Sequence, residues 1–212
     1  MKRLCIGVDP SINSTGLVVR MIENDVEKYV HFYIIKNDNH ELTKKGEKKS
    51  PLTKKELKAQ EKNDNFDYIL YDKWYGANEA SSYEREMKKT MSLMSIGEKV
   101  SEVIKNECIK HECNSVTGCI EGISYGSSGH TTAIYDLAGL NYLLRRVLLE
   151  VCEDIVVAPP GHVKKFATGN GAADKNTMIA LFEGIYPDLD IPKKDDIADA
   201  YFMSLIAERE LQ

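Results

Sequence analysis

The spacing of apolar residues predicts a chain in which strands and helices alternate. Short apolar runs at residues 4–8, 115–121 and 155–158 are typical of buried strands. Residues 15–21 and 29–35 predict two more strands, joined by a polar turn. Together with the first run they form a three-stranded antiparallel meander. The sequence therefore predicts a mixed sheet of five strands.

Apolar residues recur every three or four positions over residues 79–111 and 131–152, which predicts two long helices. We expect the methionines of the first helix, Met87, Met91 and Met94, to lie in the core. The inward residues of the second are expected to be Leu137, Leu140, Leu144, Val147 and Leu148. Shorter helices follow, and the last runs to about residue 210. The fold class is α/β, with helices flanking the sheet.

Residues 36–77 interrupt this pattern and predict an insertion in a single domain of residues 1–212. Between Lys36 and Lys62 the chain carries nine lysines and five acidic residues, with a short helix predicted near residues 52–61. Both a solvated surface and an arm that grips phosphates suit this segment. Five aromatic residues follow, which we expect to anchor the insertion rather than to stack on bases. They are Phe66, Tyr68, Tyr71, Trp74 and Tyr75.

Composition adds little to this picture. A length of 212 residues with 42% hydrophobic residues suits one domain with a sizeable core. The five cysteines form no Cys-x-x-Cys pair, which favours buried thiols and an intracellular protein. The net charge of −5 argues against a nucleic-acid partner only if no metal neutralises the acidic residues.

Acidic residues end two of the predicted strands. Asp9 follows the first apolar run and Glu121 ends the run at 115–121, so neighbouring strands bring both to one edge of the sheet. Asp196 and Asp199 are three residues apart and share one face of the last helix. Asp195 is expected to cap that helix.

Converging carboxylates without histidine or cysteine suit Mg²⁺, or Mn²⁺ in its place. Two such ions can clamp the attacking and leaving oxygens of a phosphodiester. Lys164 and Lys175 are placed to offset phosphate charge nearby. The four acidic residues therefore predict a nuclease site with two ions.

The same residues fall into four ordered motifs. They are Gly7-Val8-Asp9-Pro10 with Thr15-Gly16, Cys119-Ile120-Glu121, Val163-Lys164-Lys165 with Thr168-Gly169-Asn170-Gly171 and Lys175, and Asp196-Ile197-Ala198-Asp199-Ala200. This order resembles the RuvC-like Holliday junction resolvases, which have an RNase H-like fold. The resemblance implies a homodimer that nicks opposed strands of a four-way DNA junction with Mg²⁺. It places the four catalytic acids on Asp9, Glu121, Asp196 and Asp199, and the basic residues needed for cleavage on Lys164 and Lys175.

The chain departs from this family at two places. The insertion makes the distance between the first two acids longer than in compact bacterial members, and would suit a viral or phage member. An aromatic residue that stacks near the junction centre in bacterial members corresponds to Ser124 here, with Tyr125 beside it. Both are candidate DNA contacts, together with Lys165 and with His162, which could also carry a proton.

Other functions fit parts of the pattern. A nuclease of the same fold could cut flaps, other branched DNA or RNA/DNA hybrids, and a non-catalytic protein could bind junctions. The turn after the first strand also occurs in sugar-kinase and actin-like ATPases, although 212 residues are few for two such lobes.

Overall fold

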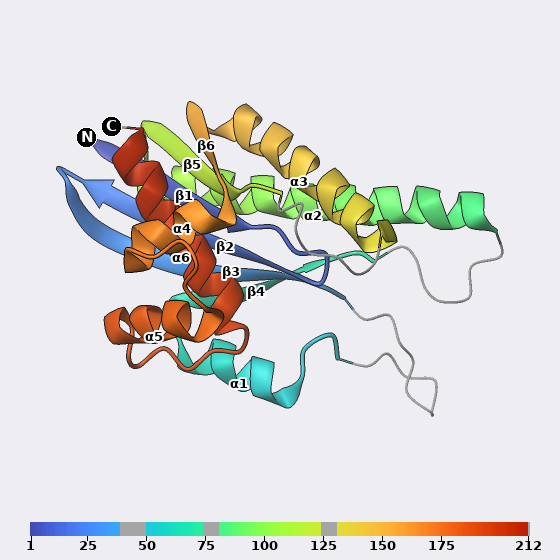
Figure 1. The fold of residues 1–212 in the computed structure, drawn as a ribbon, viewed down its shortest axis with the longest axis horizontal. Helices are drawn as coiled ribbons and strands as arrows, with labels where there is room; N and C mark the ends of the chain where they lie inside the picture. Colours follow the sequence, from blue (N-terminus) through green and yellow to red (C-terminus); the bar gives the residue numbers. More distant parts are fainter. Residues whose placement is uncertain (39–49, 74–80, 124–130, 212) are drawn as a thin grey trace.

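The computed structural model describes residues 1–38, 50–73, 81–123 and 131–211 and has a mixed six-stranded sheet at its centre (Figure 1). The strand order is β4-β3-β2-β1-β5-β6. The strands are β1 (Lys2–Asp9), β2 (Ser14–Glu23), β3 (Val26–Asn37), β4 (Phe66–Tyr71), β5 (Ser115–Glu121) and β6 (Asp154–Ala158). Strands β1, β2 and β3 form the predicted antiparallel meander, and β5 and β6 run parallel to β1.

The fold class is confirmed, with six strands rather than five. The additional strand, β4, lies in the insertion and pairs in parallel with the outer edge of β3. Its sequence, Phe-Asp-Tyr-Ile-Leu-Tyr, is rich in the aromatic and β-branched residues that favour strands. Phe66, Tyr68 and Tyr71 are buried, so the predicted anchoring role is confirmed for these three. Trp74 and Tyr75 lie outside the described residues.

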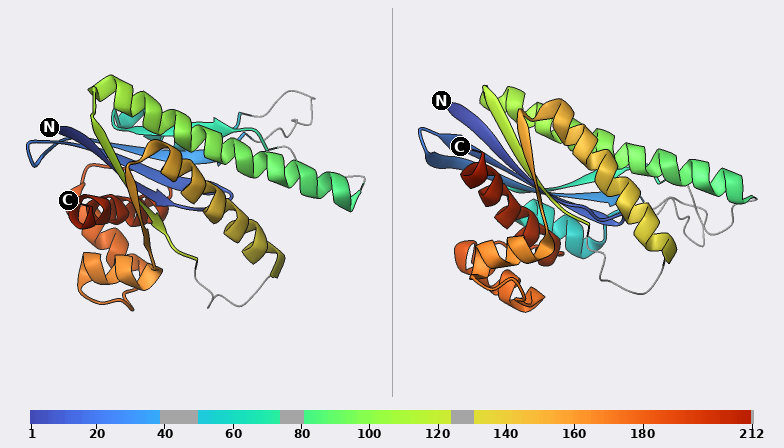
Figure 2. Two further views of the ribbon diagram at one scale, coloured as in Figure 1. Left: turned by 90° about the horizontal axis from the view of Figure 1, so that it is seen from above. Right: turned by 45° about the horizontal axis from the view of Figure 1, so that its top comes forward.

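Helices cover both faces of the sheet (Figure 2). Helices α2 (Ser82–His111) and α3 (Thr131–Val151) pack on one face, and α4 (Pro160–Thr168), α5 (Lys175–Ile185) and α6 (Lys194–Glu210) pack on the other. Helix α1 (Lys54–Lys62) confirms the short helix predicted in the insertion. None of the described helices combines the length and the apolar character needed to cross a lipid bilayer.

The expected core positions of α2 and α3 need one correction. Leu140, Leu144 and Leu148 are fully buried as predicted. The methionines of α2 are instead exposed: Met87 by 48%, Met91 by 41% and Met94 by 50%. Leu137 is exposed by 38%. Met91 and Met94 are exposed because Ser92, Ser95 and Ile96 form the buried face of α2 there, and the start of α2 runs beyond the end of the sheet (Figure 1).

Two glycines determine how closely α6 lies on the sheet. A Cβ atom on Gly7 would collide with the carbonyl oxygen of Ala200, and one on Gly16 would lie 2.5 Å from the carbonyl oxygen of Asp196. The absence of side chains at these positions of β1 and β2 lets the helix backbone contact the strands directly. The first turns of α6 are thereby brought to the end of β1.

Candidate active site

Two carboxylates lie side by side at the edge of the sheet where β1 and β5 end. The parallel register pairs Val8 with Ile120, which makes Asp9 and Glu121 the next residues of the two strands. Side chains alternate along a strand, so Asp9 lies on the same face as Gly7, the face that contacts α6. Cys119 belongs to the core on that face, and Glu121 therefore points the same way.

Helix α6 brings the other two predicted acids to this edge. Asp196 and Asp199 lie in its first turns, over the glycine contacts described above. The electrostatic field of each reaches Asp9, and Asp199 also acts on Glu121. The structure thus brings all four predicted carboxylates together, although they come from positions 9, 121, 196 and 199 of the sequence.

The role predicted for Asp195 is wrong. The residue that precedes α6 is Lys193, which has a left-handed backbone (φ 59°) and makes no side-chain capping bond. Asp195 lies inside the first turn and forms an ion pair with Lys175 at the start of α5. Partial burial acts against ionisation of Asp195, but the hydrogen bond from Lys175 holds its pKa below the ordinary value.

Asp196 has a partner that sequence reasoning missed. The buried hydroxyl of Ser14 donates a hydrogen bond of 2.7 Å to Oδ2 of Asp196. Ser14, Gly16 and Val18 alternate along β2, and Val18 belongs to the core under α6. This alternation could have identified Ser14 from the sequence, because it places Ser14 on the face of the sheet that α6 covers.

Two further bonds hold the backbone next to Asp9 and Glu121 and were not predicted. Nδ2 of Asn141, on α3, donates to the carbonyl oxygen of Glu121 at 2.7 Å. The hydroxyl of Tyr71, on β4, donates to the carbonyl oxygen of Ile12 at 2.6 Å, in the loop that follows Asp9. The insertion therefore supports the loop next to the first carboxylate.

Burial and mutual repulsion raise the pKa values of the clustered acids. Burial raises the pKa of Asp9 well above its ordinary value, and Glu121 and Asp199 add to the effect. Burial, followed by Asp199, raises the pKa of Glu121 to about 7. The pKa of Asp199 rises to about 6 through burial, although Lys164 and Lys175 oppose it. Burial also raises the pKa of Asp196. The lysines therefore do not balance the negative charge.

The donor set fits a hard divalent cation. All four side chains offer oxygen atoms only, the chemistry that Mg²⁺ and Mn²⁺ prefer. A bound cation would also remove the repulsion that raises these pKa values. As the side chains lie here, no three His, Cys, Asp or Glu residues among those described are arranged to enclose a metal ion. A shared ion would therefore require the carboxylates to lie closer to one another than they do here.

The predicted basic residues separate into two groups. Lys164, on α4, acts on both Glu121 and Asp199, and Lys175 acts on Asp199 from the start of α5. Lys165 is an exposed residue of α4 whose side chain is on the surface. Nε2 of His162 lies 3.0 Å from Oε1 of Glu210 at the far end of α6, about 16 Å along the helix axis from Asp199. The structure thus does not bring His162 to the carboxylates.

The two candidate contacts in the loop after β5, Ser124 and Tyr125, lie outside the described residues. Their predicted contact with a junction stays a prediction.

Comparison with known proteins gives similarity in structure only. No family model and no curated protein matches the sequence. The chain is similar to the Thermus thermophilus RuvC structure, with 17% identity, a TM-score of 0.45 and coverage of 97% of this chain and 92% of that one. It is also similar to T. thermophilus RuvC in complex with Holliday junction substrate, with 15% identity, a TM-score of 0.46 and coverage of 97% of this chain and 91% of that one. The yeast mitochondrial Holliday junction resolvase Ydc2 shares 11% identity and a TM-score of 0.41, with coverage of 94% of this chain and 75% of that one. The viral or phage origin stays a prediction.

Proposed function

We propose that the chain is a metal-dependent endonuclease that resolves four-way DNA junctions by paired phosphodiester hydrolysis. The observation that supports the proposal is the cluster of Asp9, Glu121, Asp196 and Asp199, whose raised pKa values indicate negative charge without sufficient counter-charge. The four motifs occur in the same order as in the RuvC-like resolvases, and this resemblance is the reason for proposing a four-way junction as the substrate. Such a cluster costs stability unless a cation and a phosphate occupy it.

Within this mechanism each residue has a physical role. Asp9, Glu121, Asp196 and Asp199 would hold Mg²⁺ or Mn²⁺, and two such ions would supply activation of the attacking water and stabilisation of negative charge on the leaving group. Ser14 holds Asp196 in place through its 2.7 Å hydrogen bond. Lys164 lies near Glu121 and Asp199, where its positive charge would attract the scissile phosphate. Lys175 is drawn toward the acids by Asp195, which raises the pKa of the lysine.

The direct test is nicking of a synthetic immobile four-way junction, with a plain duplex as the reference substrate. The reaction is run with Mg²⁺, with Mn²⁺, with EDTA, and with Asp9→Asn, which keeps the side-chain shape and removes the charge. We expect symmetric cuts in the junction that need the metal and are lost in the variant. A matched control is Asp25→Asn, since Asp25 is an exposed residue of the turn at the opposite end of β1.

The other outcomes separate the alternatives. Equal cutting of flaps or RNA/DNA hybrids would support metal-dependent nuclease activity and refute the preference for junctions. Tight junction binding without cutting in either metal would indicate a binding protein. Full activity of Asp9→Asn or Glu121→Gln would refute the proposed site.

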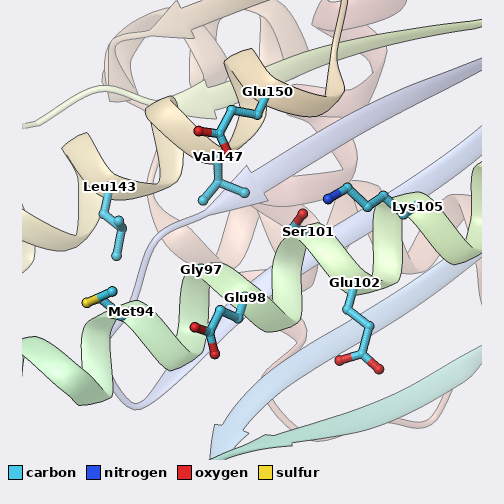
Figure 3. A pocket seen from close by; sticks show the side chains of 9 residues that line it. All are labelled: Met94, Gly97, Glu98, Ser101, Glu102, Lys105, Leu143, Val147 and Glu150. Carbon is cyan, nitrogen blue, oxygen red and sulfur yellow. The ribbon is translucent and has the colours of Figure 1, made fainter.

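Paired cuts require two active sites related by a two-fold axis, so we propose a homodimer. The surface we favour is the groove between α2 and α3, which lies on the face of the sheet opposite α6 (Figure 3). Met94 on α2 and Leu143 and Val147 on α3 form its apolar part, and its charged part is formed by Glu98, Glu102, Lys105 and Glu150. The exposed side chains of Met87 and Met91 extend this apolar surface along α2.

A charged residue in this surface tests the dimer. We expect Met91→Lys to form monomers in sedimentation experiments and to convert paired cuts into single nicks. Ile109→Lys is the matched control, because Ile109 is an exposed apolar residue at the other end of α2. A monomeric wild type that still makes paired cuts would contradict the proposed dimer.

A further inference from the structure

Helix α1 presents four lysines on one side. At 100° per residue, Lys54, Lys58, Lys62 and Lys55 fall within an arc of about 100°. All four are exposed, in a protein whose net charge is −5. Lys62 lies 3.5 Å from Asp190, and both of these side chains are more than half exposed. We call these four residues the α1 lysine face.

The rest of α1 is fixed to the body of the protein. Thr53 and Glu56 form a capping box at its start, and Oε1 of Glu56 accepts a 2.6 Å hydrogen bond from Lys36 on β3. Oε1 of Gln60 accepts a hydrogen bond of 3.1 Å from the backbone of Tyr68 on β4, and Ala59 is buried. These contacts hold the helix in one orientation, with its lysines turned outward.

The end of α1 contacts the segment that leads to the catalytic helix. Nδ2 of Asn63 donates to the carbonyl oxygens of Ala59 and Asp190, at 2.6 and 3.5 Å. Asp190 precedes Asp195 by five residues, a length of chain that spans at most about 18 Å. Figure 1 shows α1 beside α5, on the side of the sheet that carries α6. The lysine face therefore lies within a short distance of the carboxylates.

A hollow of about 330 Å³ follows this surface and is lined by Lys55, Lys58, Ala59, Lys62 and Asp190. The exposed apolar residue of α1, Leu57, lies about 60° outside the lysine arc, beside Lys54. An anionic membrane would be expected to meet a broad apolar face beside the lysines, whereas α1 offers the one exposed large apolar side chain of Leu57. Lysines without neighbouring aromatic residues are instead typical of contacts to a phosphate backbone.

We propose that the α1 lysine face binds the phosphate backbone of a duplex arm that leaves the cleavage site. This inference rests on the proposed function, and it assigns the insertion a part in substrate binding. The chain path bounds the distance from Asp190 to Asp195 at about 18 Å, and α1 adds about 10 Å from Lys62 to Lys55, so the lysine face lies up to about eight base pairs of duplex from the cleavage site. The contact therefore engages an arm beyond its first few base pairs and is independent of base sequence.

The test compares two variants with the same change in charge. Lys55→Gln/Lys58→Gln alters the lysine face and leaves Lys62 with Asp190. Lys2→Gln/Lys28→Gln is the control, because both lysines lie near the starts of β1 and β3, at the end of the sheet opposite the carboxylates. Binding is measured in EDTA, so that no strand is cut, on junctions with arms of about 20 base pairs and on hairpin-closed junctions with arms of about four.

On long arms we expect the lysine-face variant to bind about tenfold more weakly at 0.15 M salt, with a log–log salt slope smaller by about two. On short arms we expect less than a twofold change, and the control should match the wild type on both. Equal affinity of the variant and the wild type on long arms would overturn the inference. An equal loss on both arm lengths would do so too, as would lysine-dependent binding to phosphatidylserine vesicles without an effect on DNA.

The nicking assay keeps this result separate from the proposed function. If the wild type cuts no junction in Mg²⁺ or Mn²⁺ while the arm-length effect is present, nuclease activity is refuted and the duplex-binding face is supported. If the wild type cuts junctions and the arm-length effect is absent, nuclease activity is supported and the duplex-binding face is refuted.

Discussion

Replacing Glu121 with glutamine should stabilise the metal-free protein above neutral pH. Burial and the nearby Asp199 raise the pKa of Glu121 to about 7, whereas an unperturbed glutamate has a value of 4.5. The difference of about 2.5 pH units corresponds to about 3 kcal/mol, at 1.36 kcal/mol for each unit. This is the cost of keeping the Glu121 carboxylate ionised in the folded protein without a metal.

The sign follows from proton binding. Because the folded-state pKa is the higher one, the folded protein retains a proton between about pH 4.5 and pH 7 that the unfolded chain has lost. The free energy of unfolding of the wild type therefore falls as the pH rises through this window, and its contribution from Glu121 is constant above it. Glutamine carries no proton to lose, so this part of the decline disappears. Asp199, with a pKa of about 6, retains its own smaller decline.

The assay is thermal unfolding by circular dichroism in EDTA, from pH 4.5 to pH 8. At pH 8 we expect Glu121→Gln to melt about 6 to 12 °C above the wild type, and at pH 4.5 the two should agree. The control is Glu61→Gln, an exposed residue of α1, which should change the free energy of unfolding by less than about 0.5 kcal/mol at any pH. Addition of Mg²⁺ should raise the melting temperature of the wild type and remove most of the difference.

The reasoning is refuted if Glu121→Gln melts below the wild type at pH 8, or if both proteins show the same dependence on pH. Either result would mean that the carboxylate is already satisfied in the folded protein.

Three further substitutions test contacts that position α6, support Asp196 or stabilise the fold. Gly7→Ala should destabilise the protein by about 3 kcal/mol in chemical denaturation and abolish nicking, because its Cβ displaces α6, while Gly184→Ala, which meets no atom within 4 Å, should be neutral or slightly stabilising. Ser14→Ala should raise the Mg²⁺ concentration for half-maximal nicking about tenfold, with the rate recovered at saturating Mg²⁺, because Asp196 loses its donor. Arg20→Met should lower the free energy of unfolding by about 3 kcal/mol in urea denaturation, since this buried guanidinium pairs with two glutamates.

The sequence predicted that the four carboxylates lie near one another, because the position of each follows from the local pattern of apolar and polar residues. Asp9 and Glu121 each end an apolar run, and the face shared by Asp196 and Asp199 follows from helical spacing. Placing Asp9 and Glu121 at one edge of the sheet required one further expectation, that β1 and β5 are neighbours. The structure pairs these two strands. These are the features for which short-range rules suffice.

The missed features depend on contacts between distant segments. The hydrogen bond from Ser14 to Asp196 joins residues 182 positions apart, and the pairing of Asp195 with Lys175 depends on how α5 meets α6. The buried role assigned to the methionines failed for a related reason, since periodicity shows that a helix has an apolar side but not which of its residues the sheet covers. Met91 and Met94 are exposed, whereas the neighbouring Ser92 and Ser95 are buried.

A second buried carboxylate in the same protein shows why the cluster is best explained by function. Glu107 is only 5% exposed, yet it accepts hydrogen bonds from Tyr33 at 2.9 Å and Lys110 at 3.0 Å. Burial opposes its ionisation, but these donors hold its pKa below the ordinary value. Two donors thus compensate Oε1 of Glu107, and Oε2 lies 3.2 Å from Nε2 of His111. Glu121 is less buried and has a pKa of about 7, which indicates a charge that the fold leaves for something outside the chain to neutralise.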